Sequence, residues 1–255
     1  MDKSNTICFE MPTHDLMRHS LKFESLYRLV THYMDCRNEY DHRMAINALT
    51  DLLVLLDRPE LRSKYFQEFT RFRIYLDRLN NTTDIDQSRL NNILSQLQQQ
   101  LHTLEKDSGK FVPGLRNDRF FRKIIQYRNQ AVGDDCAYNT PAYYSWLQQD
   151  IEKRQEDMLQ WMTQFEDVAG IIGTYLKLVR HTGHYQTHTA PKGFYQQAID
   201  PKLTCHLIQI RLEKALAIYP KISVGRHGLS IRFVNCDETR DETQEISFEL
   251  SCCNL

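Results

Sequence analysis

Two stretches near the carboxyl end, LSIRFV at residues 229–234 and ISFELSCC at residues 246–253, place apolar side chains at every second position. A third row has Ile208, Ile210 and Leu212 at the same spacing. A period of two is typical of β-strands that turn one face toward a core. Glycines and the polar run 237–242 separate the rows. Because these connections are short, they predict an antiparallel meander.

Upstream of His181 the apolar residues recur with the period of an α-helix. Predicted helices begin near Thr13, Asp41, Pro59 and Ser88, and others cover 118–128, a short segment from Pro141, 150–165 and 166–181. Only 9 Gly and 7 Pro among 255 residues argue against collagen-like, linker-rich and disordered classes. The predicted fold class is α+β, with an N-terminal all-helical bundle domain followed by a small antiparallel β-sheet domain. The predicted boundaries are 1–185 and 186–255, with 6–10 as a candidate edge strand that joins the sheet.

The segment 88–105 carries a narrow leucine stripe at spacings of four and three: Leu90, Leu94, Leu97, Leu101 and Leu104. Such a stripe pairs with one partner helix. The partner is either another helix of the same bundle or a second copy of the chain. Two heptads are too short for an independent coiled coil, which favours the first interpretation.

Charge and hydropathy exclude several classes of protein. The 32 basic and 33 acidic residues give a net charge of −1, which creates no global field for DNA or anionic lipid. The longest apolar run, LLVLL at 52–56, is too short to span a membrane, and the first residues lack the apolar core of a signal peptide. We therefore expect a cytoplasmic protein with no membrane partner. Its seven cysteines have no repeated spacing and are expected to be free thiols.

Motifs of common enzymes are absent from the sequence, including a GxxxxGK loop, a GxGxxG fingerprint and a GxSxG elbow. We therefore predict no enzyme and no cofactor. His181, His184 and His188 have a spacing that can bind zinc. They straddle a predicted helix end and have no carboxylate or cysteine close in sequence. A solvated junction is favoured over a metal site at these histidines.

The segment KFVPGLRNDRFFRKIIQYR at 110–128 is strongly basic, with Lys110, Arg116, Arg119, Arg122, Lys123 and Arg128 against the single Asp118. In a helix, Arg116, Arg119 and Lys123 form a cationic stripe, with Phe120, Ile124 and Tyr127 on another flank. Acids from neighbouring helices can neutralise this stripe, or it can recognise an anion. The second interpretation is favoured because the run lacks its own counter-charges and guanidinium forks suit carboxylates and phosphates.

Several collinear segments resemble the ZapD family, cytoplasmic proteins of the bacterial division ring. They include ICFEMP at 7–12, LMRHSLKFE at 16–24, DQSR at 86–89, LRNDR at 115–119, KGFYQ at 192–196, YPKIS at 219–223 and FELSCC at 248–253. GFYQ and FELSCC are the most specific pieces. The resemblance implies a homodimer with a helical and a small β domain. It also implies binding to the short C-terminal tail of FtsZ, the tubulin-like division GTPase, and crosslinking of FtsZ filaments at mid-cell.

The same resemblance implies a basic pocket for the tail. An Arg late in the family's first helical segment corresponds to Lys22, the second Arg of the LRxDR motif is Arg119, and a His after the loop proline corresponds to Tyr144. Lys22 keeps the charge without the bidentate fork, and Tyr144 keeps a ring without the cation that histidine offers. Helical spacing adds Arg18, Arg116 and Arg122 as neighbours.

A nucleic-acid-binding protein that uses the Arg-rich helix 116–128 is the alternative function. The near-neutral overall charge argues against it, so we predict no nucleic-acid partner.

Overall fold

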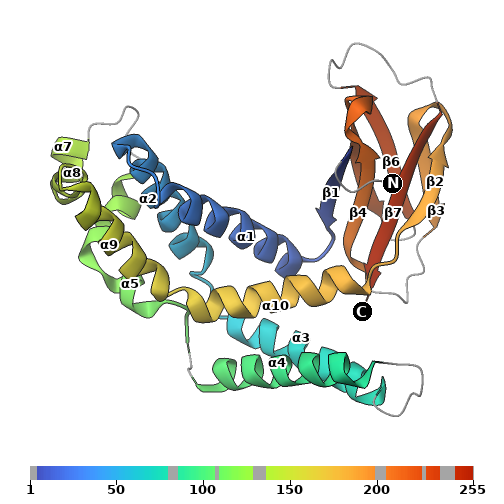
Figure 1. The fold of residues 1–255 in the computed structure, drawn as a ribbon, viewed down its shortest axis with the longest axis horizontal. Coiled ribbons are helices and arrows are strands. Elements are labelled where there is room, and N and C mark those ends of the chain that lie inside the picture. The colour runs from blue at the N-terminus through green and yellow to red at the C-terminus, as the bar shows by residue number, and fades with distance from the viewer. Residues whose placement is uncertain are drawn as a thin grey trace. The chain divides into compact units, whose positions relative to one another are not determined.

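A computed structural model of the chain describes residues 5–79, 86–106, 109–128, 136–198, 205–225, 228–235 and 245–254. The contacts divide the chain into two compact units. The helical unit is His19–Tyr175, and the strand unit joins Met1–Arg18 to Leu176–Leu255. Apart from one strand at residues 6–12, the helices precede the antiparallel strands along the chain (Figure 1), which confirms the predicted α+β class. The predicted domain boundaries at 185 and 186 stay a prediction.

Ten α-helices are described: α1 (Asp15–Tyr33), α2 (Glu39–Leu55), α3 (Leu61–Leu79), α4 (Gln87–Lys106), α5 (Pro113–Asn117), α6 (Arg119–Arg128), α7 (Cys136–Asn139), α8 (Pro141–Leu147), α9 (Ile151–Thr163) and α10 (Glu166–Thr182). The side chain of Asn38, rather than Asp41, caps α2 by accepting a hydrogen bond from the Tyr40 amide at 2.9 Å. None of the described helices is both long and apolar enough to cross a bilayer.

Large apolar side chains form the core of the helical unit. Ile46, Leu49 and Leu52 of α2 are fully buried. Tyr65 of α3 is also fully buried, and its ring meets Tyr175 edge-on with centroids 5.6 Å apart. The hydroxyls of Tyr65 and Ser20 share a hydrogen bond of 2.8 Å, which satisfies both polar groups inside this core.

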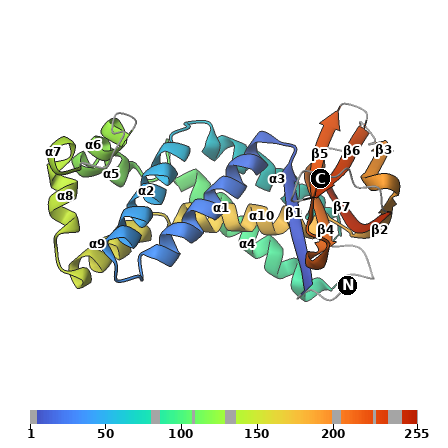
Figure 2. The same ribbon diagram turned by 90° about the horizontal axis from the view of Figure 1, so that it is seen from above.

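The leucine stripe of α4 has its partner within the chain. Figures 1 and 2 show α4 lying alongside α3, and the two helices contact one another. Leu90, Leu97, Leu101 and Leu104 are buried, and Leu94 is half-buried. The structure therefore supports the interpretation in which the stripe is part of an intramolecular bundle.

The strand unit contains two antiparallel sheets rather than the single predicted meander. The four-stranded sheet has the order β1 (Thr6–Pro12), β4 (Cys205–Glu213), β7 (Ile246–Asn254), β2 (Gln186–Ala190). The three-stranded sheet has the order β3 (Phe194–Ala198), β6 (Gly228–Asn235), β5 (Ile218–Gly225). Among the described strands, only β5 and β6 are both consecutive and paired. The predicted separator at 237–242 lies outside the described residues.

Two sheets form because apolar side chains from both of them bury one another. Ile208 and Phe248 of the four-stranded sheet and Ile231 of the three-stranded sheet belong to one buried cluster. Opposed apolar faces are the usual core of two packed sheets. The prediction of a meander was wrong because it assumed that strands adjacent in sequence pair with each other. β1 lies at one edge of the larger sheet, where Phe9 is opposite Ile210.

Candidate functional site

The basic segment forms two helices because Asp118 interrupts it. Asp118 has an extended backbone, with φ −62° and ψ 134°, and ends α5. Its carboxylate accepts a hydrogen bond from the Phe120 amide at 2.7 Å, and its carbonyl accepts one from the Arg122 amide at 3.1 Å. Asp118 therefore acts as the N-cap of α6, in the manner typical of aspartate. The break means that Arg116 does not continue the stripe of Arg119 and Lys123.

One side of α6 carries exposed cations, Arg119, Arg122 and Lys123, which we call the α6 surface. Residues three and four apart lie on the same side of a helix. Phe121 and Ile124 on the other side are buried. Within the described parts of the chain, no carboxylate forms an ion pair with any residue of the α6 surface.

Arg116 and Lys110 are not part of this unpaired set. Both form ion pairs with the carboxylate of Asp57, which follows the end of α2. The Arg116 guanidinium, by its hydrogen bond, and the Lys110 ammonium hold the pKa of Asp57 below its usual value. The sequence analysis favoured anion recognition because the basic segment has few acidic residues of its own. For Lys110 and Arg116 that interpretation was wrong, because Asp57, which is distant in the sequence, neutralises both.

An aromatic cluster fixes α6 against α8 and α9. The Phe120 ring lies 5.6 Å from Trp161, and 6.1 Å from both Tyr143 and Trp146, measured between centroids. The indole of Trp146 also donates a hydrogen bond of 3.0 Å to Asp157. Aromatic pairs at such distances stabilise by about 0.5–1.5 kcal/mol each beyond their burial. The cluster therefore holds the α6 surface in a defined orientation.

Tyr144 lies on α8 directly after Tyr143, whose ring contacts Phe120. Tyr144 is 41% exposed, whereas Tyr143 is buried. Tyr144 therefore lies on a helix that packs against α6, the helix that carries Arg119 and Arg122.

Lys22 and Arg18 lie one turn apart on α1, and both are exposed. Among the described residues, Lys22 makes no hydrogen bond, ion pair or ring contact with Arg119 or Tyr144. Figure 2 shows α2 between α1 and the helices α5, α6 and α8, and α2 contacts both α6 and α8. The structure therefore separates the predicted site residues into an α6–α8 group, an α1 pair, and Arg116 of α5, which pairs with Asp57.

Among the three histidines, His184 and His188 line one pocket of the strand unit, whereas His181 lies in the last turn of α10. His181 contacts the Lys177 carbonyl through Nδ1 at 2.6 Å, and His188 contacts the Tyr195 hydroxyl through Nδ1 at 3.0 Å. Over the ranges that the structure describes, no three His, Cys, Asp or Glu side chains are grouped as a metal site requires.

Sequence reasoning missed two contributors to this region. Trp161 of α9 is half-buried under Phe120, and Asp57 neutralises part of the basic segment. The aromatic content of 141–147 was a usable signal for packing. No local signal indicated that Asp57 meets Arg116.

Comparison with known proteins decides the family. A family model described as ZapD, cell division protein, matches residues 21–232. The chain belongs to the ZapD family. Proteins named cell division protein ZapD are similar over nearly their whole length. The protein from Coxiella burnetii (strain RSA 493) is 32% identical over 99% of both chains. That from Nitrosomonas europaea is 28% identical over 98% of this chain and 95% of its own.

A ZapD protein of Vibrio vulnificus (strain CMCP6) is 26% identical over 96% of this chain and 98% of its own. The family match begins at residue 21, within α1, and ends at residue 232, within β6. It therefore includes the α6 surface, Tyr144 and Lys22. The ZapD relatives are named as cell division proteins, so the chain is a member of a cell division protein family.

Proposed function

We propose that this chain binds the C-terminal tail of FtsZ and, as a homodimer, crosslinks FtsZ filaments in the cytoplasm at the division site. Membership of the ZapD family supports the setting in cell division. The observation that carries the site is the α6 surface, whose three cations have no described carboxylate partner. The action requires binding only, with no catalytic step and no cofactor.

The α6 surface offers what an acidic peptide with apolar side chains needs. Arg119 and Arg122 present planar donor groups that match carboxylates, and Tyr144 presents an exposed ring on the adjoining helix. Exposed ion pairs are each worth about 0–1 kcal/mol and are screened by salt. A single tail is therefore held weakly. Arg18 and Lys22 stay proposed as tail contacts on α1.

Crosslinking follows from valence. A symmetric dimer carries two copies of the α6 surface, and a filament presents many tails. Simultaneous engagement raises the overall affinity over a single site by a factor of about 10² to 10⁴. Weak sites therefore suffice for stable filament bundles.

The first test is co-sedimentation with FtsZ filaments. We expect Arg119→Glu to reduce the pelleted chain to its level without FtsZ, because it places a negative charge at the centre of the α6 surface. Arg78→Glu, at an exposed position on α3, makes the same change in net charge and should pellet like the unchanged chain. The proposal is wrong if both variants bundle filaments equally well.

Tail-deleted FtsZ identifies the epitope in the same assay. We expect no pelleting with filaments that lack the tail, and weaker pelleting at moderate than at low salt. The dimer of the Arg119→Glu variant, checked by analytical ultracentrifugation, should persist. Bundling of tail-deleted filaments would show that the tail is not the binding partner.

The alternative, nucleic-acid binding by residues 116–128, makes a different forecast. It requires that random single-stranded or duplex oligonucleotides bind with an affinity that falls steeply as salt rises. A fluorescence titration with these oligonucleotides at low salt decides between the two functions. We expect no saturable binding.

A further inference from the structure

Two cysteines of the strand unit lie together beside a pocket. Cys205 begins β4 and Cys252 lies near the end of β7, the strand next to it. Cys205 is opposite Asn254, and Cys252 is opposite Ile208, with an irregularity between Cys205 and Leu207. Paired residues of antiparallel strands share a face, as do residues two apart on one strand. Both thiols are therefore on the same face of the sheet.

The packing agrees with the register. Both Cys205 and Cys252 pack against the buried apolar cluster between the two sheets. Their side chains interact directly with one another. Diagonal partners on antiparallel strands lie about 7–8 Å apart, and a disulfide spans up to about 7 Å between Cα atoms. Closing that gap takes a movement on the order of 1 Å, which the irregularity next to Cys205 can absorb.

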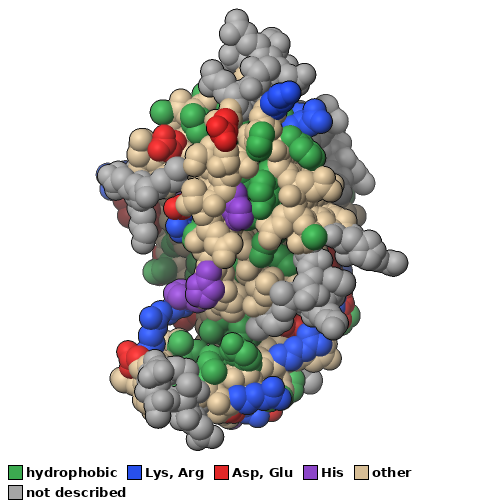
Figure 3. Space-filling view, turned by 90° about the vertical axis from the view of Figure 1, so that its right-hand side faces the viewer, with side chains coloured by type: hydrophobic (Ala, Val, Ile, Leu, Met, Phe, Trp, Pro, Cys, Tyr) green, Lys and Arg blue, Asp and Glu red, His purple; other side chains and the backbone are tan. Residues whose placement is uncertain are grey.

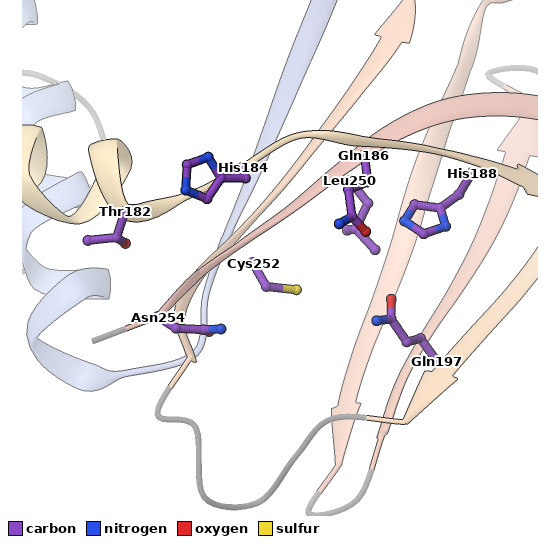
Figure 4. A pocket seen from close by; sticks show the side chains of 8 residues that line it. All are labelled: Thr182, His184, Gln186, His188, Gln197, Leu250, Cys252 and Asn254. Atoms are coloured by element: carbon purple, nitrogen blue, oxygen red, sulfur yellow. The ribbon is translucent and has the colours of Figure 1, made fainter. Parts of the chain in front are cut away.

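A pocket of about 230 Å³ gives small molecules access to Cys252. Its lining includes His184, His188, Gln197 and Asn254. Figure 4 shows the Cys252 sulfur directed into this space, with His184 and His188 among the side chains around it, and Figure 3 shows that histidine side chains are exposed on the face it draws. The lining consists of uncharged and histidine side chains and contains no carboxylate. A small disulfide that carries negative charge, such as glutathione disulfide, is therefore not repelled there.

We propose that Cys252 and Cys205 form a reactive dithiol that exchanges with low-molecular-weight disulfides such as glutathione disulfide. The Cys252 thiolate attacks one sulfur of the reagent, forms a mixed disulfide and releases one glutathione thiolate. Cys205 then gives its proton to solvent and attacks the Cys252 sulfur, which releases the second glutathione. Two cysteine thiols are oxidised to one disulfide, and one glutathione disulfide is reduced to two thiols.

The electrostatics support this order of attack. The interaction with Cys205 lowers the pKa of Cys252 to about 7. The interaction with Cys252, and then burial, raise the pKa of Cys205. A thiolate is the attacking species in exchange, so Cys252 is the residue that meets the reagent and Cys205 the one that resolves the mixed disulfide.

Cys253 is a matched control because it is adjacent in sequence but on the opposite face. It is fully buried, its thiol lies 3.5 Å from the Gln209 side-chain oxygen, and burial raises its pKa to about 11. Cys36 of the helical unit is a second reference, since burial and the neighbouring aspartates raise its pKa.

The test treats the reduced full-length chain with glutathione disulfide at several pH values, then alkylates and digests it for mass spectrometry. We expect a 205–252 linkage that dithiothreitol reverses. Cys252 should be modified at pH 7 about tenfold faster than Cys36, because more of it is thiolate. The rate at Cys252 should reach half its maximum near pH 7. In urea this preference for Cys252 should disappear.

Variants separate the two roles. Cys205→Ser should leave Cys252 carrying one glutathionyl group, Cys252→Ser should leave Cys205 unmodified, and Cys253→Ser should keep the 205–252 linkage. Circular dichroism confirms that each variant is folded. The proposal is overturned if the folded chain forms no 205–252 linkage, or if Cys205 reacts equally well in the absence of Cys252.

Discussion

At the scale of single residues, Asp57 shows that charge in a sequence differs from charge at a surface. It pairs with Lys110 and Arg116, so about a third of the basic segment has a counter-ion. Among the basic side chains of the segment that the structure describes, Arg119, Arg122 and Lys123 remain without an ion pair. Removing one carboxylate therefore changes how many cations a partner meets.

We expect Asp57→Asn to strengthen binding of an FtsZ tail peptide at low salt by up to about fivefold, because it releases two cations whose pairs are worth about 0–1 kcal/mol. Fluorescence anisotropy with a labelled peptide measures this affinity. Asp77→Asn on α3 makes the same charge change away from the α6 surface and serves as the control. Equal or weaker binding by Asp57→Asn would contradict the role of the α6 surface.

His42 makes the helical unit sensitive to acid. It is fully buried, burial lowers its pKa, and Nε2 lies 2.8 Å from the Cys36 carbonyl. Since the unfolded chain binds a proton more readily, the free energy of unfolding is unaffected above the unfolded pKa of about 6.5 and falls as the pH drops below it.

We expect the urea midpoint of the helical unit to fall between about pH 6.5 and pH 5, and His42→Gln to reduce that fall. Gln keeps a donor for the Cys36 carbonyl and does not titrate. Urea titrations of both chains at each pH measure the effect. If the urea midpoint of His42→Gln falls with pH as steeply as that of the unchanged chain, groups other than His42 cause the acid sensitivity.

At the scale of elements, the start of α6 depends on Asp118. Its carboxylate accepts from the Phe120 amide, and the helix that follows carries the α6 surface. The orientation of Arg119 therefore depends on a residue that does not itself contact a partner.

Asp118→Ala should lower the free energy of unfolding by about 0.5–2 kcal/mol and weaken tail binding, because α6 loses its cap. Asp118→Asn keeps an oxygen acceptor and should be close to the unchanged chain in stability. Urea unfolding and peptide anisotropy test the two effects separately. If the Ala and Asn variants lose stability equally, the side-chain cap at Asp118 does not stabilise the start of α6.

The sequence predicted elements better than their pairing. Leucines at spacings of four and three indicated α4, and alternation indicated β4, β6 and β7. Strands β2 (QTHTA) and β3 (FYQQA) were missed because they are only five residues long, and β5 (Ile218–Gly225) was not predicted either. In the site, Arg119 and Tyr144 could be chosen from local signals and family resemblance. The ion pairs of Asp57 and the order of the strands in the two sheets could not be predicted, because both depend on contacts between distant segments.

At the scale of the whole molecule, Glu10 of β1 connects segments from both ends of the strand unit. Its carboxylate accepts two hydrogen bonds from Arg180, at 2.8 and 2.7 Å, and one from the Gln209 amide at 2.8 Å. Bidentate pairs of this kind are stronger than single exposed ion pairs.

We expect Glu10→Ala to destabilise the strand unit by about 1–3 kcal/mol, because the Arg180 charge and the Gln209 amide lose their acceptor. Glu249→Ala is the control, since its pair with Arg211 has a longer separation of 3.7 Å and should cost at most about 1 kcal/mol. Chemical denaturation of both variants measures the difference. Equal losses would show that the Glu10 contacts add nothing beyond a surface ion pair.

The position of β1 at the edge beside β4 also has a consequence for synthesis on the ribosome. His19–Tyr175 is continuous in sequence, so the helical unit can fold while translation proceeds. β1 emerges early, but its partner strand begins only at Cys205 and the next strand at Ile246. The apolar side chains of β1 stay uncovered until the last strands leave the exit tunnel, which makes this segment a natural client for chaperones that act on nascent chains.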